Sequence, residues 1–78
     1  MTTQATIKTI EPTYSTLHEI VRALIRVEET DQAFLVIGQE ARILSGLAAG
    51  THLEIDGSMQ VNLLSGDYAT LVDHAHVV

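Results

Sequence analysis

Residues 16–30, Thr-Leu-His-Glu-Ile-Val-Arg-Ala-Leu-Ile-Arg-Val-Glu-Glu-Thr, decide the fold that the sequence predicts. Thr16 and Glu19 have the spacing of a capping box, in which each side chain accepts a hydrogen bond from a free amide of the first helical turn. Apolar side chains then recur at helical spacing, with polar side chains on the opposite side. These apolar positions are Leu17, Ile20, Val21, Leu24 and Val27, and Ile25 widens the stripe. The pattern predicts one amphipathic helix over residues 16–30.

Strands are expected on both sides of this helix. Residues 5–10 alternate as a short strand that Glu11 and Pro12 end. Residues 33–37 are a continuous apolar run closed by Gly38, which is typical of a strand buried on both faces. Two interpretations of residues 39–50 stay open: a short helix that Gly50 ends, or a strand returning after a turn at Gly38. The alanine content favours the helix.

The last third of the chain predicts a three-stranded meander. Residues 51–55 alternate, Asp56-Gly57 is a strong hairpin signal, and residues 58–63 alternate again. A second turn follows at residues 65–67, and residues 68–78 carry the final strand. The expected class is therefore α+β, a small single compact domain over residues 1–78. Its one amphipathic helix packs on a mixed, largely antiparallel sheet that ends in the meander.

The composition limits the classes of function. The 78 residues include four Lys or Arg and ten Asp or Glu, so the net charge is −6. So few cations argue against direct nucleic-acid binding by charge. The absence of cysteine excludes a disulfide scaffold and a cysteine-based zinc module. No signal-type segment and no apolar run of ~20 residues is visible, so we expect a cytoplasmic protein with no membrane contact.

The small size favours self-association. A chain of this length buries only ~60–65 % of its unfolded surface, and it has no disulfide to add stability. The apolar C-terminal residues Ala75, Val77 and Val78 are expected at a sheet edge, where a second copy would cover them. A homo-oligomer, most simply a homodimer, is therefore expected.

The histidines suggest one alternative function, the binding of a transition metal. His74-Ala75-His76 places two imidazoles on the same face of a strand. His52 and Glu54 have the same spacing. Together, His52, Glu54, His74 and His76 would form a nitrogen and oxygen site suited to Zn, Ni or Cu. The other interpretation of the pattern is the solvated face of an edge strand, and no cofactor besides a divalent transition metal is expected.

No pattern points to catalysis. His18 lies on the polar face of the predicted helix, without a nucleophile or acid in reach by spacing. Gly38-Gln39-Glu40 lacks the glycines and the lysine of a phosphate-binding loop. The serines lack the context of a nucleophile elbow. We therefore expect a protein that is not an enzyme.

The second half of the chain is anionic, because all four cations lie in the first 42 residues. Its acidic and aromatic side chains are the surface that we expect to meet a protein partner. These residues are Glu54, Asp56, Asp67, Tyr68 and Asp73. The function favoured is a small acidic protein-interaction module that acts as a regulator or inhibitor. A ligand-binding subunit is a further alternative.

Two segments, residues 16–21 and residues 61–68, loosely resemble the helix–hairpin pattern of Phd/YefM-type antitoxins. The resemblance implies an antitoxin-like regulator that acts by binding another protein. No residue role is carried over from it.

Overall fold

The computed structural model describes residues 2–78, which form a mixed sheet of seven strands and one short helix. The elements are β1 (Thr2–Tyr14), β2 (Ile20–Val27), β3 (Ala33–Ile37), α1 (Gly38–Leu44), β4 (His52–Asp56), β5 (Met59–Asn62), β6 (Tyr68–Leu71) and β7 (His74–Val77). The strand order is β5-β6-β3-β2-β1-β4-β7, and only β3 and β6 pair in parallel. The α+β class is thus confirmed in its coarse form, although strands dominate.

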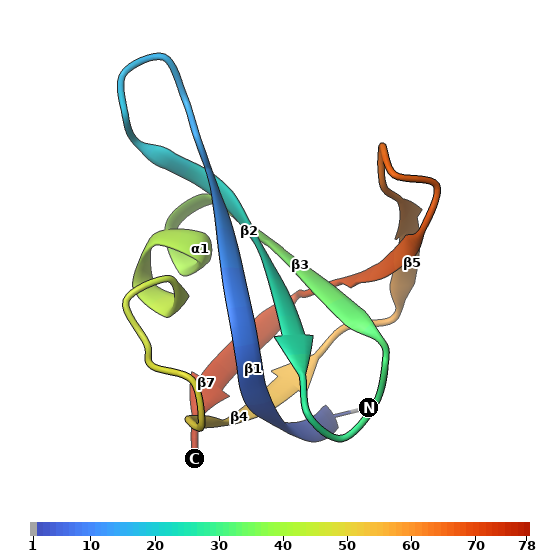
Figure 1. Cartoon of the computed structure of the whole chain (residues 1–78). Coiled ribbons are helices and arrows are strands. Elements are labelled where there is room, and N and C mark those ends of the chain that lie inside the picture. The colour runs from blue at the N-terminus through green and yellow to red at the C-terminus, as the bar shows by residue number, and fades with distance from the viewer. Residues whose placement is uncertain (1) are drawn as a thin grey trace.

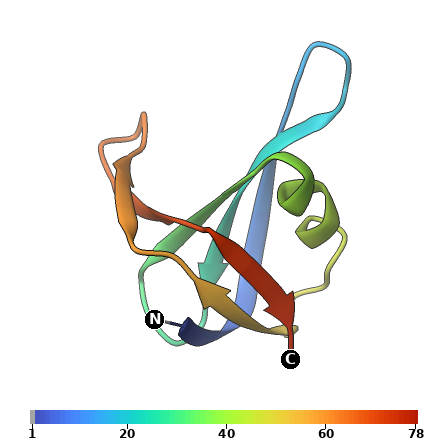
Figure 2. The ribbon, with the colours of Figure 1, turned by 180° about the vertical axis from the view of Figure 1, so that it is seen from behind.

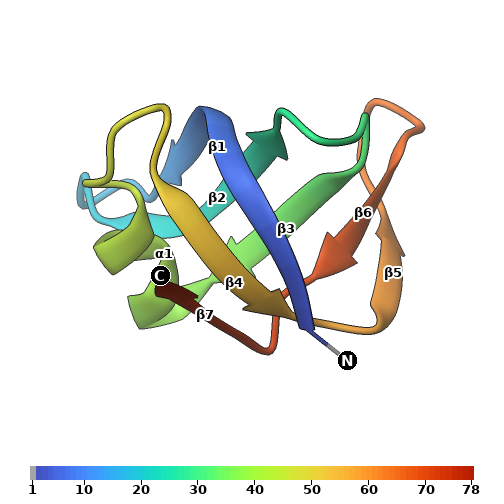
Figure 3. The same ribbon diagram turned by 90° about the horizontal axis from the view of Figure 1, so that it is seen from below.

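The sheet closes because four of its strands are halves of two longer, bent runs. β4 continues past Asp56 into β5, and β6 continues past Leu71 into β7. β4 pairs with β7 and β5 pairs with β6, so the two runs form one long hairpin that bends in its middle. β4 also pairs with β1, and β6 also pairs with β3. β1, β2, β3 and the two bent runs are therefore the five strands of a closed barrel (Figures 1 and 3).

The core fills the inside of this barrel. The largest side chains with almost no exposure come from four different strands. They are Ile7, Ile25, Val36, Leu53 and Ile55. α1 adds Ala41 and Leu44 to the same cluster, so the helix packs against the barrel instead of covering a flat sheet. No helix within residues 2–78 is long and apolar enough to cross a bilayer.

The predicted helix over residues 16–30 is wrong, since most of this stretch is strand β2. Inside β2, Ala23, Ile25 and Val27 are buried, which is the period of a strand. β1 and β3 pair with β2 on its two sides and take its backbone hydrogen bonds. The predicted capping box is instead a turn, in which the Ser15 hydroxyl accepts hydrogen bonds from the amides of Leu17 and Glu19. The helix of the antitoxin resemblance is therefore missing.

The three-stranded meander is also wrong. At Asp56-Gly57 the chain bends and does not reverse, because β4 and β5 pair with different strands and not with each other. Gly57 is needed for close packing: a Cβ atom there would overlap the carbonyl group of Leu71. The turn at residues 65–67 is confirmed, as it joins β5 to β6.

The other expectations about elements are partly confirmed. The strand at residues 33–37 is β3, and the favoured helix after it is α1, although it starts at Gly38 and ends at Leu44. β1 is longer than predicted and runs through Pro12 to Tyr14. Proline is tolerated there because β1 pairs with β4 only as far as Thr6, so the outer part has a strand on one side alone.

Candidate functional site: a groove between two hairpins

Two hairpins project from the barrel in the same general direction (Figures 1 and 2). A groove lies between them. One is the β1–β2 hairpin, whose tip is residues 15–19, and the other is the β5–β6 hairpin, whose tip is residues 63–67. The groove has a volume of about 700 Å³. Its lining residues are Glu11, Pro12, Thr13, Arg22, Leu24, Leu35, Val61, Asn62, Leu63, Leu64 and Ser65.

The floor of the groove is apolar because leucines stand side by side on neighbouring strands. Leu24 on β2 pairs with Leu35 on β3, and both side chains are half-buried. Both face outward, since the residues on either side of them in each strand are buried in the barrel. Val61 adds a third half-buried apolar side chain from β5. The outer face of the barrel thus carries an apolar strip at the base of the two hairpins.

Each hairpin tip presents a leucine to solvent. Leu17 is 78 % exposed and Leu64 is fully exposed, at 105 %. The turn that carries Leu64 is fixed by its backbone: the Leu63 amide donates to the Asp67 carbonyl, and the Gly66 amide donates to the Leu63 carbonyl. Gly66 has a φ of 90°, which suits glycine. An ordered turn therefore holds an apolar side chain out in water.

Charge in the groove is sparse and balanced. Glu11 and Arg22 are the charged residues of the lining, one of each sign. No aromatic side chain lines the groove, although Tyr14 and Tyr68 are exposed nearby at strand ends. The groove therefore differs from the rest of this acidic chain, and what it offers to a ligand is mainly apolar surface.

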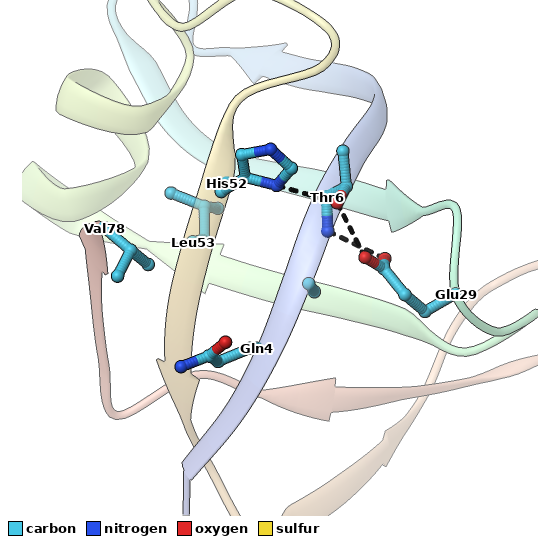
Figure 4. A pocket seen from close by; sticks show the side chains of 7 residues that line it. Gln4, Thr6, Glu29, His52, Leu53 and Val78 are labelled. Carbon is cyan, nitrogen blue, oxygen red and sulfur yellow. Dashed lines mark hydrogen bonds between the residues drawn. The ribbon is translucent and has the colours of Figure 1, made fainter.

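A second hollow, of about 370 Å³, holds a chain of three polar side chains (Figure 4). Glu29, in the β2–β3 loop, accepts hydrogen bonds from the Thr6 amide at 2.7 Å and from the Thr6 hydroxyl at 2.6 Å. Nδ1 of His52 lies 3.0 Å from the same hydroxyl oxygen. The hydroxyl bond and then the amide bond lower the pKa of the Glu29 carboxyl below its usual value.

This arrangement is structural and is not a nucleophilic triad. In such a triad the imidazole lies between the hydroxyl and the carboxylate, so that it can take the hydroxyl proton. Here Thr6 lies in the middle and gives its one proton to Glu29, which leaves His52 to donate from Nδ1. Thr6 is also where β1 stops pairing with β4, so the three side chains join the β2–β3 loop, β1 and β4 at that point.

The structure brings two of the four predicted metal ligands, Glu54 and His76, into contact. On paired strands β4 and β7, Glu54 lies opposite His76, with 3.5 Å between Oε1 and Nε2, and His74 is two residues away. His74 instead contacts Glu40 of α1, at 3.5 Å from Nδ1 to Oε1. His52 belongs to the hollow of Figure 4. Within residues 2–78, no group of three or more His, Cys, Asp or Glu side chains has an arrangement that could hold a metal ion.

The predicted protein-binding residues fall in two places. Asp67 and Tyr68 are on the β5–β6 hairpin, next to the groove. Glu54, Asp56 and Asp73 are near the β4–β7 pair, where the Asp73 amide donates to the Asp56 carbonyl. The sequence did not identify the leucines of the groove, because Leu17 and Leu24 were placed in a helix. The signal for Leu64 was available: Leu63 and Leu64 are adjacent, so in an extended chain they face opposite sides.

The predicted oligomer edge is a true sheet edge, since β7 is the last strand of the order. It contains Ala75 and Val77, and Val78 follows with its amide bonded to the His52 carbonyl. α1 approaches this strand at its first residue, where Glu40 of α1 contacts His74.

No protein-family model matches the chain, and no curated protein is significantly similar to it. The geometry described above is the basis for the proposals that follow.

Proposed function

We propose that the chain is a non-enzymatic module that binds a partner protein, as a regulator or inhibitor, by taking apolar side chains of the partner into the groove between the two hairpins. One observation carries this proposal. Leu64 lines the groove and is fully exposed, and Leu17 is exposed on the tip of the other hairpin, whose base lines the groove. Apolar surface gathered around a concavity is typical of an interaction site, whereas single exposed apolar residues are common everywhere.

The strand connectivity supports this location. A five-stranded barrel in which the first strand pairs with the second and fourth, and the third pairs in parallel with the fifth, has the connectivity of the OB-fold. OB-folds bind ligands over strands 2 and 3, between the loops that join strands 1 to 2 and 4 to 5. That face corresponds to the groove floor, and those loops correspond to the two hairpin tips. Because fold alone does not determine function, the ligand class is argued from the residues.

The residues favour a polypeptide over a single-stranded nucleic acid. Single strands are bound by a positively charged groove with aromatic side chains on which the bases stack. The lining has one cation, Arg22, one anion, Glu11, and no aromatic ring. Leu24, Leu35 and Val61 instead suit aliphatic or aromatic side chains of a protein segment, and Glu11 and Arg22 can pair with its flanking charges.

Site-specific photocrosslinking in the native host tests this proposal. A photoreactive amino acid replaces Leu64 in one variant and Ile43 in a control variant. Ile43 is also an exposed aliphatic side chain, at 63 %, and lies on α1 outside the groove. We expect one protein species to be crosslinked from position 64 and not from position 43. This crosslink should be lost when Leu35→Asn is added. Equal crosslinking from both positions, or none from position 64, would contradict the proposal.

A further inference from the structure

We infer that two copies of this chain pair through the free edges of their β5 strands, antiparallel and centred on Val61, to form a symmetric dimer. This interface is formed by the backbone edge of β5, whereas the groove is lined by side chains that include Val61 and Leu63. It follows from a comparison of the backbone edges that residues 2–78 leave unpaired. Those edges are β5, β7 and the outer part of β1, beyond the residues that pair with β4. Proteins protect exposed edges with charges, proline, irregular pairing or a covering element.

Two of the three edges carry such protection. The outer part of β1 includes Lys8, Glu11 and Pro12, and its pairing with β2 shifts register between Ile7 and Thr9. At β7, Glu40 of α1 contacts the first residue of the strand, His74. A further strand is therefore hindered at both places.

β5 has none of these features. Met59–Asn62 contains no charged residue and no proline, and its pairing with β6 is regular. The uncharged stretch extends over residues 58–66. β5 stands on the outer side of the β5–β6 hairpin, away from the barrel (Figures 1 and 2). This edge is therefore the one that another strand can join.

The hydrogen-bond pattern shows which backbone groups are available. The Leu63 amide donates to the Asp67 carbonyl, so residues 63 and 67 form a hydrogen-bonded pair. Such pairs alternate along an antiparallel ladder, so Val61 and Met59 also direct their backbone groups at β6. The backbone groups of Gln60 and Asn62 then point away from β6, into the space that a second strand would fill.

A second copy of the chain fits this edge better than an unrelated strand. With Val61 opposite Val61 at the two-fold axis, Gln60 of each copy pairs with Asn62 of the other, which gives about four backbone hydrogen bonds. The same register sets Met59 of one copy beside Leu63 of the other. Met59, Val61 and Leu63 are apolar, and Met59 is 62 % exposed in the single chain.

Charge permits a second copy at this edge, although it opposes contact elsewhere. The chain has a net charge of −6, so two copies repel each other over most of their surface. Residues 58–66 carry no charge and avoid that repulsion at the contact. For the same reason this edge has no charged side chain with which to select an oppositely charged partner.

Single-cysteine variants test the interface, because the native chain has no cysteine. In the inferred dimer, residue 61 faces its copy in a non-hydrogen-bonded pair, with Cα atoms about 4.5 Å apart, which is within disulfide range. We expect Val61→Cys to form a disulfide-linked dimer when oxidised by glutathione disulfide, which is reduced to glutathione. The matched control is Val77→Cys on β7, which is 52 % exposed and is expected to stay uncrosslinked. A dimer formed through Val77→Cys, and not through Val61→Cys, would overturn the inference.

Sedimentation of cysteine-free chains gives an independent readout. Gln60→Pro removes an amide that points away from β6, so it blocks the added strand while it leaves the β5–β6 bonds intact. We expect this variant to raise the dimer dissociation constant about tenfold or more, the effect of about two lost hydrogen bonds. Gln60→Thr keeps the amide and is expected to behave as wild type. A wild-type chain that sediments as a monomer at every concentration, or equal dimerisation of both variants, would overturn the inference.

Discussion

The backbone of Gly57 packs directly against the carbonyl group of Leu71, so closely that no side chain fits at position 57. The contact lies at the bend of the long hairpin, where β4 passes into β5 and β6 passes into β7. On one side of the bend β4 joins β1, and on the other β6 joins β3. This one close approach therefore both closes the barrel and sets the β5–β6 hairpin beside the groove.

Gly57→Ala is expected to destabilise the protein, because the new Cβ atom must displace a backbone carbonyl. Forcing extra atoms into a packed site costs about 1–3 kcal/mol, and the rigid neighbour places this site at the upper end. The free energy of unfolding by urea measures the effect. Ser58→Ala, an exposed neighbour, is the control and should stay within about 0.5 kcal/mol of wild type. Equal stability of the Gly57→Ala variant and wild type would show that the bend is packed differently.

A pair of adjacent substitutions tests the strand at Ile20–Val27. Ile25 is fully buried inside the barrel, and Leu24 is half-buried on the groove floor. Ile25→Ala should therefore cost about 2–5 kcal/mol of unfolding free energy, and Leu24→Ala clearly less. An amphipathic helix over the same residues would reverse this order, since Leu24 would lie in the middle of its apolar face. Chemical denaturation of the two variants decides between the two structures.

Glu29→Gln should change how stability depends on pH. Hydrogen bonds from the Thr6 hydroxyl and amide favour the ionised carboxylate, so its pKa in the folded state lies below the usual 4.5. A lowered pKa adds stability above the unfolded-state value, and that stability is lost as the pH falls through the folded-state value. The variant should be less stable than wild type at pH 7, and the difference should shrink below about pH 4.5. Unfolding curves over a pH series measure this, and a difference independent of pH would refute the role of the carboxylate.

The hairpin-tip leucines should affect binding without affecting stability. Leu17 and Leu64 are exposed, so Leu17→Ser and Leu64→Ser should leave the unfolding free energy within about 0.5 kcal/mol of wild type. Each should nevertheless weaken capture of the partner found by crosslinking, because it removes apolar surface from the groove rim. Ile43→Ser on α1 is the matched control, and it should change neither quantity. Equal loss of capture in the control would place the binding surface elsewhere.

Much of the sheet could be predicted from the sequence, because local patterns determine it. Residues 33–37 are β3, and the turn at residues 65–67 joins β5 to β6. In the segment at residues 20–27, the spacing of the apolar residues fits a helix, whereas the buried residues alternate as in a strand. Pairing with β1 on one side and β3 on the other decides in favour of the strand, and this pairing is not visible in the period of the segment itself.

The bend at Gly57 shows why the topology could not be predicted in the same way. Asp-Gly between alternating segments usually marks a hairpin, and the local sequence contains nothing against it. The reason for the glycine is the carbonyl of Leu71, a residue that lies beyond the next turn. A hairpin at this position would not make β5 and β6 a wall of the groove. The sequence therefore predicts a binding surface at Glu54, Asp56, Asp67, Tyr68 and Asp73 and misses the apolar floor.

Amide hydrogen exchange of the partner-bound chain tests the central proposal most directly. If the groove binds the partner, exchange should slow in residues 11–24 and 59–68, which include both hairpin tips, compared with the free chain. Residues 52–56 and 73–77, where Glu54, Asp56 and Asp73 lie, should exchange as before. Slowing confined to residues 52–56 and 73–77, with the hairpin tips unchanged, would contradict a binding site in the groove.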